Sequence, residues 1–128
     1  MLLATLIVAT SAQTTTQDVT RATAGLVFLL QAPGNCLAVV ADLPPNPPSS
    51  NMAALWIRAA FHDAGTYDPT DLSGGADASV AHYRDAPENA GLDGSLGSKF
   101  LPNLNVKLSS ADAIQLAAVV AITHCILG

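Results

Sequence analysis

Charged and aromatic residues are scarce in this sequence. Of its 128 residues, 12% are charged and 5% are aromatic, whereas 50% are hydrophobic, and much of that apolar content is alanine. A mean hydropathy of +0.38 excludes a disordered chain. Because alanine is a strong helix former and strands favour aromatic residues, the composition favours close-packed helices over a β-sandwich. The length is that of one small domain, which we expect to be all-α.

Positive charge is equally scarce. The net charge is -5, and the five basic residues are far apart in the sequence: Arg21, Arg58, Arg84, Lys99 and Lys107. No basic patch for nucleic acid or an anionic membrane is therefore expected.

Cysteine is limited to Cys36 and Cys125, and no Asn-x-Ser/Thr glycosylation sequon occurs. A bridge between the two cysteines would close a long loop and tie the end of the first expected helix to the last. Two buried free thiols are the alternative.

The N-terminus carries a short apolar run. Residues 1–12 read MLLATLIVATSA, end in small residues and precede a polar stretch. The run is too short to span a bilayer, and it predicts a secretory signal peptide cleaved after Ala12, which would make the chain extracellular. A plain N-terminal core helix is the alternative. Residues 13–50 would then hold a helix and a proline-rich linker, and residues 51–128 the functional domain.

Four helices are expected, separated by segments rich in glycine, proline and aspartate. Ser49 or Ser50 is expected to cap the second helix, and the Ser109–Asp112 pair the last. The second and the last are apolar nearly all round, which predicts that both lie inside a core. The expected ranges are Asp18–Gln31, Asn51–Ala64, Ser79–Arg84 and Ser109–Leu127, with the linker Leu43–Ser50 and a loop Gly65–Asp77 between them.

Chemistry is concentrated in Arg58-Ala-Ala-Phe61-His62-Asp63. Arg58 and His62 are four residues apart, so they lie on one helix face, and both groups are costly on an apolar helix unless something occupies the space they face. Asp63 points about 100° away and needs its own partner. Downstream, Asp77, Ser79 and glycine carbonyls complete an all-oxygen set with Asp63, which is typical of Ca²⁺ ligands.

These motifs resemble the distal half of the plant, fungal and bacterial haem peroxidases, over about Ala54 to Cys125. Phe61, Asp63 and Gly75-Ala76-Asp77-Ala78-Ser79 are similar to the secreted fungal class. Two other stretches are similar to the ascorbate and cytochrome c peroxidase class. They are Gly65-Thr66-Tyr67-Asp68 with Asp71 and Gly74-Gly75, and Asn89-Ala90-Gly91-Leu92. The mixture of the two classes suggests a fungal hybrid-type peroxidase.

The resemblance implies the distal half of the peroxidase helical fold, with a calcium-binding loop and haem b. His62 would be the general base and then acid toward hydrogen peroxide. Arg58 would stabilise the charge that develops as the O–O bond breaks. Asn89 would accept a hydrogen bond from His62, and Phe61 would pack on the haem face. Calcium would be held by Asp63, Gly75, Asp77 and Ser79.

Other features depart from the family or leave alternatives. An organic reductant would be the second substrate, but no histidine stands in the context of the family's iron ligand, which would belong to a missing C-terminal half. His82 is expected at the surface and His124 near a helix end, and Trp56 in the core rather than at a radical site. No acidic pair for manganese precedes His62. The alternatives are a non-catalytic secreted calcium-binding fragment and a zinc hydrolase using His62, Asp63 and His82 or His124.

Overall fold

The computed structural model describes residues 14–31, 36, 51–92, 96 and 107–127, and this part of the chain is helical. Its one non-helical pairing is an isolated bridge between Asp68 and Ser73. The all-α expectation is therefore confirmed. The predicted signal peptide and the linker Leu43–Ser50 lie outside the described residues. The elements are α1 (Thr16–Leu30), α2 (Met52–Ala64), α3 (Ser79–His82), the 3-10 helix η1 (Pro87–Asn89), α6 (Ser110–Ala121) and the π-helix η2 (Ile122–Ile126).

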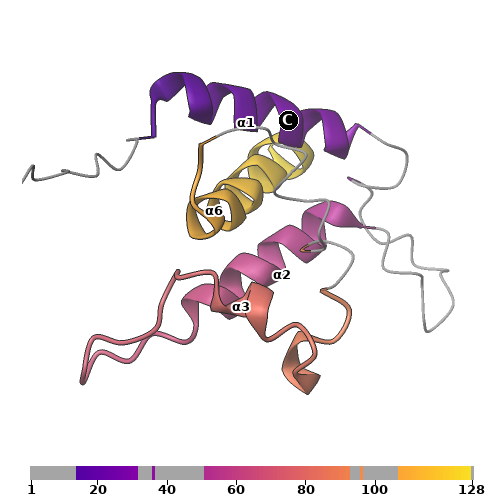
Figure 1. Cartoon of the computed structure of the whole chain (residues 1–128). Helices are drawn as coiled ribbons and strands as arrows, with labels where there is room; N and C mark the ends of the chain where they lie inside the picture. Colours follow the sequence, from indigo (N-terminus) through magenta and orange to yellow (C-terminus); the bar gives the residue numbers. More distant parts are fainter. Residues whose placement is uncertain (1–13, 32–35, 37–50, 93–95, 97–106, 128) are drawn as a thin grey trace, which may run out of the picture.

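The helices stack in layers, with α6 between α1 and α2 (Figure 1). The core lies at these two contacts, and its largest fully buried apolar side chains are Trp56, Leu26, Leu30, Leu92 and Ile114. Trp56 is 1% exposed, which confirms its expected place in the core. The stack is what holds α2, and with it Arg58 and His62, in a fixed position.

Each long helix begins at a side chain that accepts a backbone N–H. The Thr15 hydroxyl accepts from the amide of Asp18, and Ser109 does the same for Asp112, as the sequence pattern predicts for the last helix. For α2 the expected cap is wrong, because the Asn51 side chain and not Ser49 or Ser50 accepts from the amide of Ala54. Asn51 is as good a cap as serine and stands one position closer to the apolar run.

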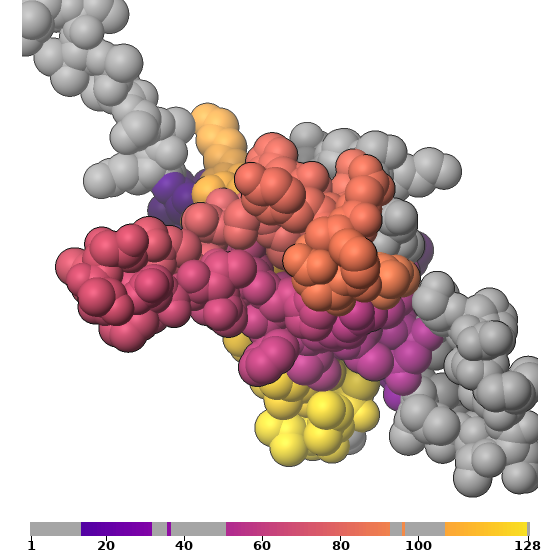
Figure 2. Space-filling model, turned by 90° about the horizontal axis from the view of Figure 1, so that it is seen from below, coloured from indigo at the N-terminus to yellow at the C-terminus, as the bar shows by residue number. Residues whose placement is uncertain are grey.

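Neither α2 nor α6 is buried all round, contrary to the expectation from their apolar sequences. Phe61 on α2 is 74% exposed, and Val119 on α6 is 56% exposed. Each helix buries one face against its neighbours, and its other side carries these exposed apolar side chains. Figure 2 shows the end of the chain projecting from the body on the α6 side, while the loop after α2 forms a lobe at another end.

The last helix departs from its predicted α-form. It is α-helical to Ala121 and then widens into the π-helix η2 (Ile122–Ile126), which contains the exposed His124. Cys125 in this turn forms a disulfide with Cys36, across 89 residues of sequence, with a Cα–Cα distance of 5.1 Å. The bridge, and not the pair of free thiols, is therefore the outcome. In the described part of the chain, no helix combines the length and apolarity needed to cross a bilayer.

Candidate active site

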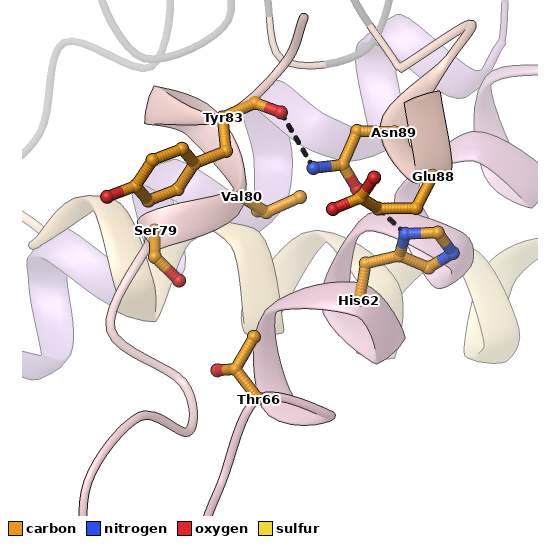
Figure 3. A pocket seen from close by; sticks show the side chains of 7 residues that line it. All are labelled: His62, Thr66, Ser79, Val80, Tyr83, Glu88 and Asn89. Atoms are coloured by element: carbon orange, nitrogen blue, oxygen red, sulfur yellow. Dashed lines mark hydrogen bonds between the residues drawn. The ribbon is translucent and has the colours of Figure 1, made fainter. Parts of the chain in front are cut away.

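His62 lies in the last turn of α2 and contacts the short helix η1. Its Nδ1 is 2.8 Å from Oδ1 of Asn89, which is 5% exposed. Figure 3 shows the imidazole and the carboxamide meeting edge to edge. The structure thus brings together the two residues that the sequence places 27 positions apart.

A backbone carbonyl fixes which way the Asn89 carboxamide faces. Its Nδ2 donates to the carbonyl of Tyr83 at 2.8 Å, so Oδ1 must be the atom that faces His62. An amide oxygen only accepts, and Nδ1 of His62 must therefore donate to it. In the neutral ring, Nε2 is then the nitrogen that keeps a lone pair.

Nε2 of His62 points away from Asn89 (Figure 3), and in the described part of the chain no hydrogen bond reaches it. Arg58, Phe61 and His62 lie at the spacing that puts them on one side of α2, which we call its open side because Phe61 is exposed there. The exposed Phe61 ring lies edge-to-face with the His62 imidazole, with 6.1 Å between ring centroids and 66° between ring planes. This face therefore combines a proton acceptor with an uncovered aromatic surface, which is the composition that a flat, largely apolar cofactor requires.

Arg58 is partly buried one turn earlier on the same face of α2. Its Nη1 donates to the carbonyl of Ala90 and its Nη2 to the carbonyl of Glu88, each at 2.8 Å. Hydrogen bonds from a charged donor at this distance are the stronger kind. The guanidinium thus binds the carbonyls of the two residues that flank Asn89 in the sequence.

A small cavity lies between α2, α3 and η1, beside His62 (Figure 3). Its volume is about 130 Å³, room for a few water molecules or one small solute. The cavity lies on the Asn89 side of the imidazole, away from Nε2. Its lining is His62, Thr66, Ser79, Val80, Tyr83, Glu88 and Asn89.

Asp63 leaves α2 about 100° around the helix from His62 and is fully buried, at 0% exposure. Its Oδ2 accepts the amide N–H of Ala78 at 3.0 Å, and its Oδ1 accepts that of Val80 at 3.3 Å. The predicted need for a separate partner is met by backbone amides, which join the end of α2 to the start of α3. Two N–H donors compensate a buried carboxylate.

Thr66 closes the loop between these helices. Its hydroxyl donates to the Asp63 carbonyl at 2.8 Å and lies 3.4 Å from the Gly75 carbonyl, while it accepts the Gly75 amide at 3.0 Å. The neighbouring Gly74 has φ +68, and a Cβ there would meet the Thr66 carbonyl oxygen at an impossibly short distance. The Thr66 hydrogen bonds and the close approach of Gly74 to the Thr66 carbonyl together hold the two ends of the loop next to each other.

The four predicted calcium ligands lie around this loop, and oxygens of three of them, Asp63, Gly75 and Asp77, accept hydrogen bonds from neighbouring groups. Asp77 is exposed. Hydrogen bonds from Ser79 lower the pKa of the Asp77 carboxyl, with the larger effect from the Ser79 hydroxyl and the smaller from its backbone N–H. Ca²⁺ takes about six to eight oxygen ligands, and a carbonyl or carboxylate oxygen that accepts one hydrogen bond keeps a second lone pair, so the calcium site at Asp63, Gly75, Asp77 and Ser79 stays a prediction. In the residues that the structure describes, no three His, Cys, Asp or Glu side chains converge on a point, which removes the zinc alternative.

Sequence reasoning found the side chains and missed the backbone groups that orient them. The carbonyls of Tyr83, Glu88 and Ala90 are decisive here, and no residue-type pattern signals them. Thr66 carried a signal, since a hydroxyl three residues after Asp63 can reach back to the end of the helix. His82 is exposed, as expected.

Comparison with known proteins gives similar sequences among plant peroxidases. The chain is 42% identical over 79 residues to a protein named putative L-ascorbate peroxidase 6 of Arabidopsis thaliana, covering 57% of this chain and 23% of that protein. It is 39% identical to peroxisomal L-ascorbate peroxidase 5 of the same plant, covering 58% of this chain and 28% of that protein. The chain thus spans about a quarter of the length of these relatives. No solved structure matches it.

The family profile for peroxidase matches residues 38–128, which is most of the chain and includes all of α2, α3, η1 and α6. The match covers Arg58, His62 and Asn89, which the fold brings together where α2 meets η1. On this evidence, the chain belongs to the peroxidase family.

Proposed function

We propose that this chain forms the distal side of a haem peroxidase, which reduces hydrogen peroxide and oxidises an organic donor. The observation that carries the proposal is the hydrogen bond from Nδ1 of His62 to Asn89, which leaves Nε2 as a base on the same helix face as Arg58. The family match and the ascorbate peroxidase relatives support the same chemistry. A non-catalytic calcium-binding fragment is not favoured, because the peroxidase profile matches most of the chain and the similar sequences are ascorbate peroxidases.

Haem fits the open side of α2. The Phe61 ring is uncovered there, and Arg58 and His62 stand in the same helical row, so a flat group would meet one aromatic side chain, one cation and one base. When bound, haem supplies the iron at which the peroxide O–O bond is broken. We propose haem b, with Phe61, Arg58 and His62 as the residues that line its distal face.

His62 moves the proton in this proposal. Its Nε2 takes a proton from one oxygen of hydrogen peroxide and returns it to the oxygen that leaves as water. Asn89 keeps the other ring nitrogen protonated and stabilises the imidazolium while His62 holds the extra proton. The transfer needs no change of tautomer, because the orientation is set before peroxide arrives.

Arg58 stabilises negative charge. A guanidinium has five N–H donors, and two of them are used on the carbonyls of Glu88 and Ala90. The remaining three can donate toward the oxygen that becomes negative as the O–O bond lengthens. A donor already fixed in place stabilises such charge without reorganisation.

We also propose the organic reductant, the peroxidase class and the cellular compartment of this protein. The relatives named above are ascorbate peroxidases, and ascorbate is therefore the first organic reductant to test. The secreted fungal or hybrid type remains a proposal that depends on residues 1–12 and on the Gly75-Ala76-Asp77-Ala78-Ser79 motif. Calcium held by Asp63, Gly75, Asp77 and Ser79 is likewise a proposal, and it takes no part in the proposed proton transfer.

The test is haemin binding followed by turnover. Haemin added to the full chain should give a Soret band, and the loaded chain should oxidise ascorbate or a phenolic dye with peroxide. His62→Ala should lower the second-order rate with peroxide by about 10²- to 10⁴-fold, the usual contribution of a positioned acid–base group. His82→Ala is the matched control, because His82 is exposed and outside the site. Equal rates in the two variants would end the role given to His62.

A further inference from the structure

The helix η1 and its flanking residues form a turn over residues 86–92, the η1 turn. Three consecutive residues of this turn contact the proposed catalytic pair, Arg58 and His62. Asn89 bonds to His62 through its side chain, and the residues on either side of it bond to Arg58 through their carbonyls. Glu88 and Ala90 are two positions apart, and their carbonyls are bound by the two terminal nitrogens of one guanidinium. The turn is thus gripped at both ends, with Asn89 in the middle.

The direction of the Asn89 carboxamide depends on where its backbone is held. The side chain is short and has two partners, His62 on one edge and the Tyr83 carbonyl on the other, both at 2.8 Å. A small rotation of the turn would lengthen both bonds. A planar guanidinium that binds two carbonyls resists that rotation, since the fork fixes two points and not one.

We propose that Arg58 is a positioning residue for Asn89 and, through it, holds His62 in the tautomer that carries its proton on Nδ1. The role is additional to charge stabilisation, and its catalytic meaning rests on the proposed function above. No haem is needed for this effect: the hydrogen bonds from Arg58 to the carbonyls of Glu88 and Ala90 set the tautomer of an imidazole to which Arg58 makes no hydrogen bond in the described part of the chain.

Gly91 supports this arrangement from the next position along the chain. Its φ of +86 is a conformation that residues with a side chain rarely adopt, and a Cβ built there would lie 3.9 Å from Nη1 of Arg58. The space beside the guanidinium is therefore sufficient, and the cost of a side chain at this position lies in the backbone. Gly91→Ala should disturb the turn while leaving the Arg58 side chain unchanged.

The experiment measures the tautomer of His62 in the full chain without haem. Chemical shifts of the two ring nitrogens of ¹⁵N-labelled protein are recorded at alkaline pH, where a neutral imidazole reports its tautomer directly. Hydrogen exchange of the amides of Asn89 and Leu92 gives a second readout, because both donate within the turn, to Ala86 and Asn89 respectively. The variants are Arg58→Ala, Arg58→Gln and Arg58→Lys, with Arg21→Ala as a control that removes one exposed positive charge on α1.

Wild type and Arg21→Ala should show His62 with its proton on Nδ1. Arg58→Ala and Arg58→Gln should convert it to a mixture of tautomers and speed exchange of the two amides by on the order of tenfold. Arg58→Lys should resemble Arg58→Ala more than wild type, because one ammonium group cannot bind both carbonyls in the same geometry. Gly91→Ala should move both readouts in the same direction by a smaller amount.

An unchanged tautomer and unchanged exchange in the Arg58 variants would overturn the proposal. If Arg58→Ala loses helical structure by circular dichroism, Arg58→Gln and Arg58→Lys decide in its place, and Gly91→Ala tests the turn without altering Arg58. Failure of the chain to bind haemin would count against the proposed function and would leave these measurements valid, since none of them uses haem.

Discussion

His62 and Asp63 are neighbours in the sequence but are held by different kinds of partner. His62 is partly exposed and bonds to a side chain, the carboxamide of Asn89, whereas Asp63 is fully buried and bonds to two backbone amides. The two side chains leave α2 in different directions, as the helical period requires. One faces the turn that holds the candidate active site, and the other faces the start of α3.

This difference teaches where each interaction can fail. The partners of Asp63 are N–H groups that nearly every residue type supplies, so only Asp63 itself is specific on that side. The partner of His62 exists only if position 89 is an amide and only if that amide faces the right way. We therefore expect changes on the Asp63 side to alter stability, and changes on the His62 side to alter chemistry.

The largest effect should come from Asp63→Ala. The change leaves the amides of Ala78 and Val80 buried without acceptors, and the free energy of unfolding should fall by roughly 2 to 5 kcal/mol. Denaturant unfolding measures this, with Asp85→Ala as a control that removes an exposed carboxylate from the same part of the chain. A loss no greater than that of the control would mean that the two amides find other acceptors.

Asn89→Val tests the His62 side, where we expect a change in chemistry. His62 would lose the acceptor of its Nδ1 proton, and the rate of the haemin-loaded chain with peroxide should fall by about 10- to 100-fold, as is usual when a group that orients a functional histidine is removed. Peroxide kinetics and the unfolding free energy are measured together. Asn51→Ala at the opposite end of α2 is the control: it removes a helix cap and should cost about 1 kcal/mol without changing the rate per folded molecule.

Thr66→Val tests whether the loop beside Asp63 is closed by hydrogen bonds. The variant keeps the shape of threonine and loses the hydroxyl that joins the Asp63 carbonyl to Gly75, at an expected cost of about 1 kcal/mol. Thr66→Ser should retain most of the stability. Removal of calcium with a chelator tests the calcium site that the sequence predicts: a clear fall in the melting temperature of the wild type would support the site, and an unchanged value would count against it.

The smallest expected effect is a change in how the melting temperature depends on pH between pH 6 and pH 3. In the loop, the side chains and then the amides of Thr70 and Ser73 lower the pKa of the Asp68 and Asp71 carboxyls below the usual 3.8. Because the folded pKa values are depressed, the stabilisation is present above the unfolded value and is lost as pH falls through the folded one. Melting temperatures measured from pH 6 to pH 3 should therefore fall less steeply in Asp71→Asn than in wild type. Identical slopes would show that these exposed turns do not affect global stability.

Much of the site was predictable from the sequence because it depends on helical spacing and residue type. The four-residue interval between Arg58 and His62 places them on one face, and Asp63 must then face elsewhere. The pairing of Asn89 with His62 followed from the resemblance to peroxidases. The cap of α2 was predicted wrongly, since adjacent serine and asparagine residues all suit that position and local sequence does not choose between them.

By itself, the sequence determined that the described part of the chain is helical and where its long helices run, and it predicted which side chains carry the chemistry, because these follow from local periodicity and residue type. Only the tertiary structure decided that α2 and α6 each keep one apolar face uncovered, that Asp63 is satisfied by amides, and that Arg58 holds the turn containing Asn89. Those outcomes depend on backbone N–H and C=O groups, which every residue possesses. Their pairing is fixed by how distant segments pack and leaves no mark in the pattern of side chains.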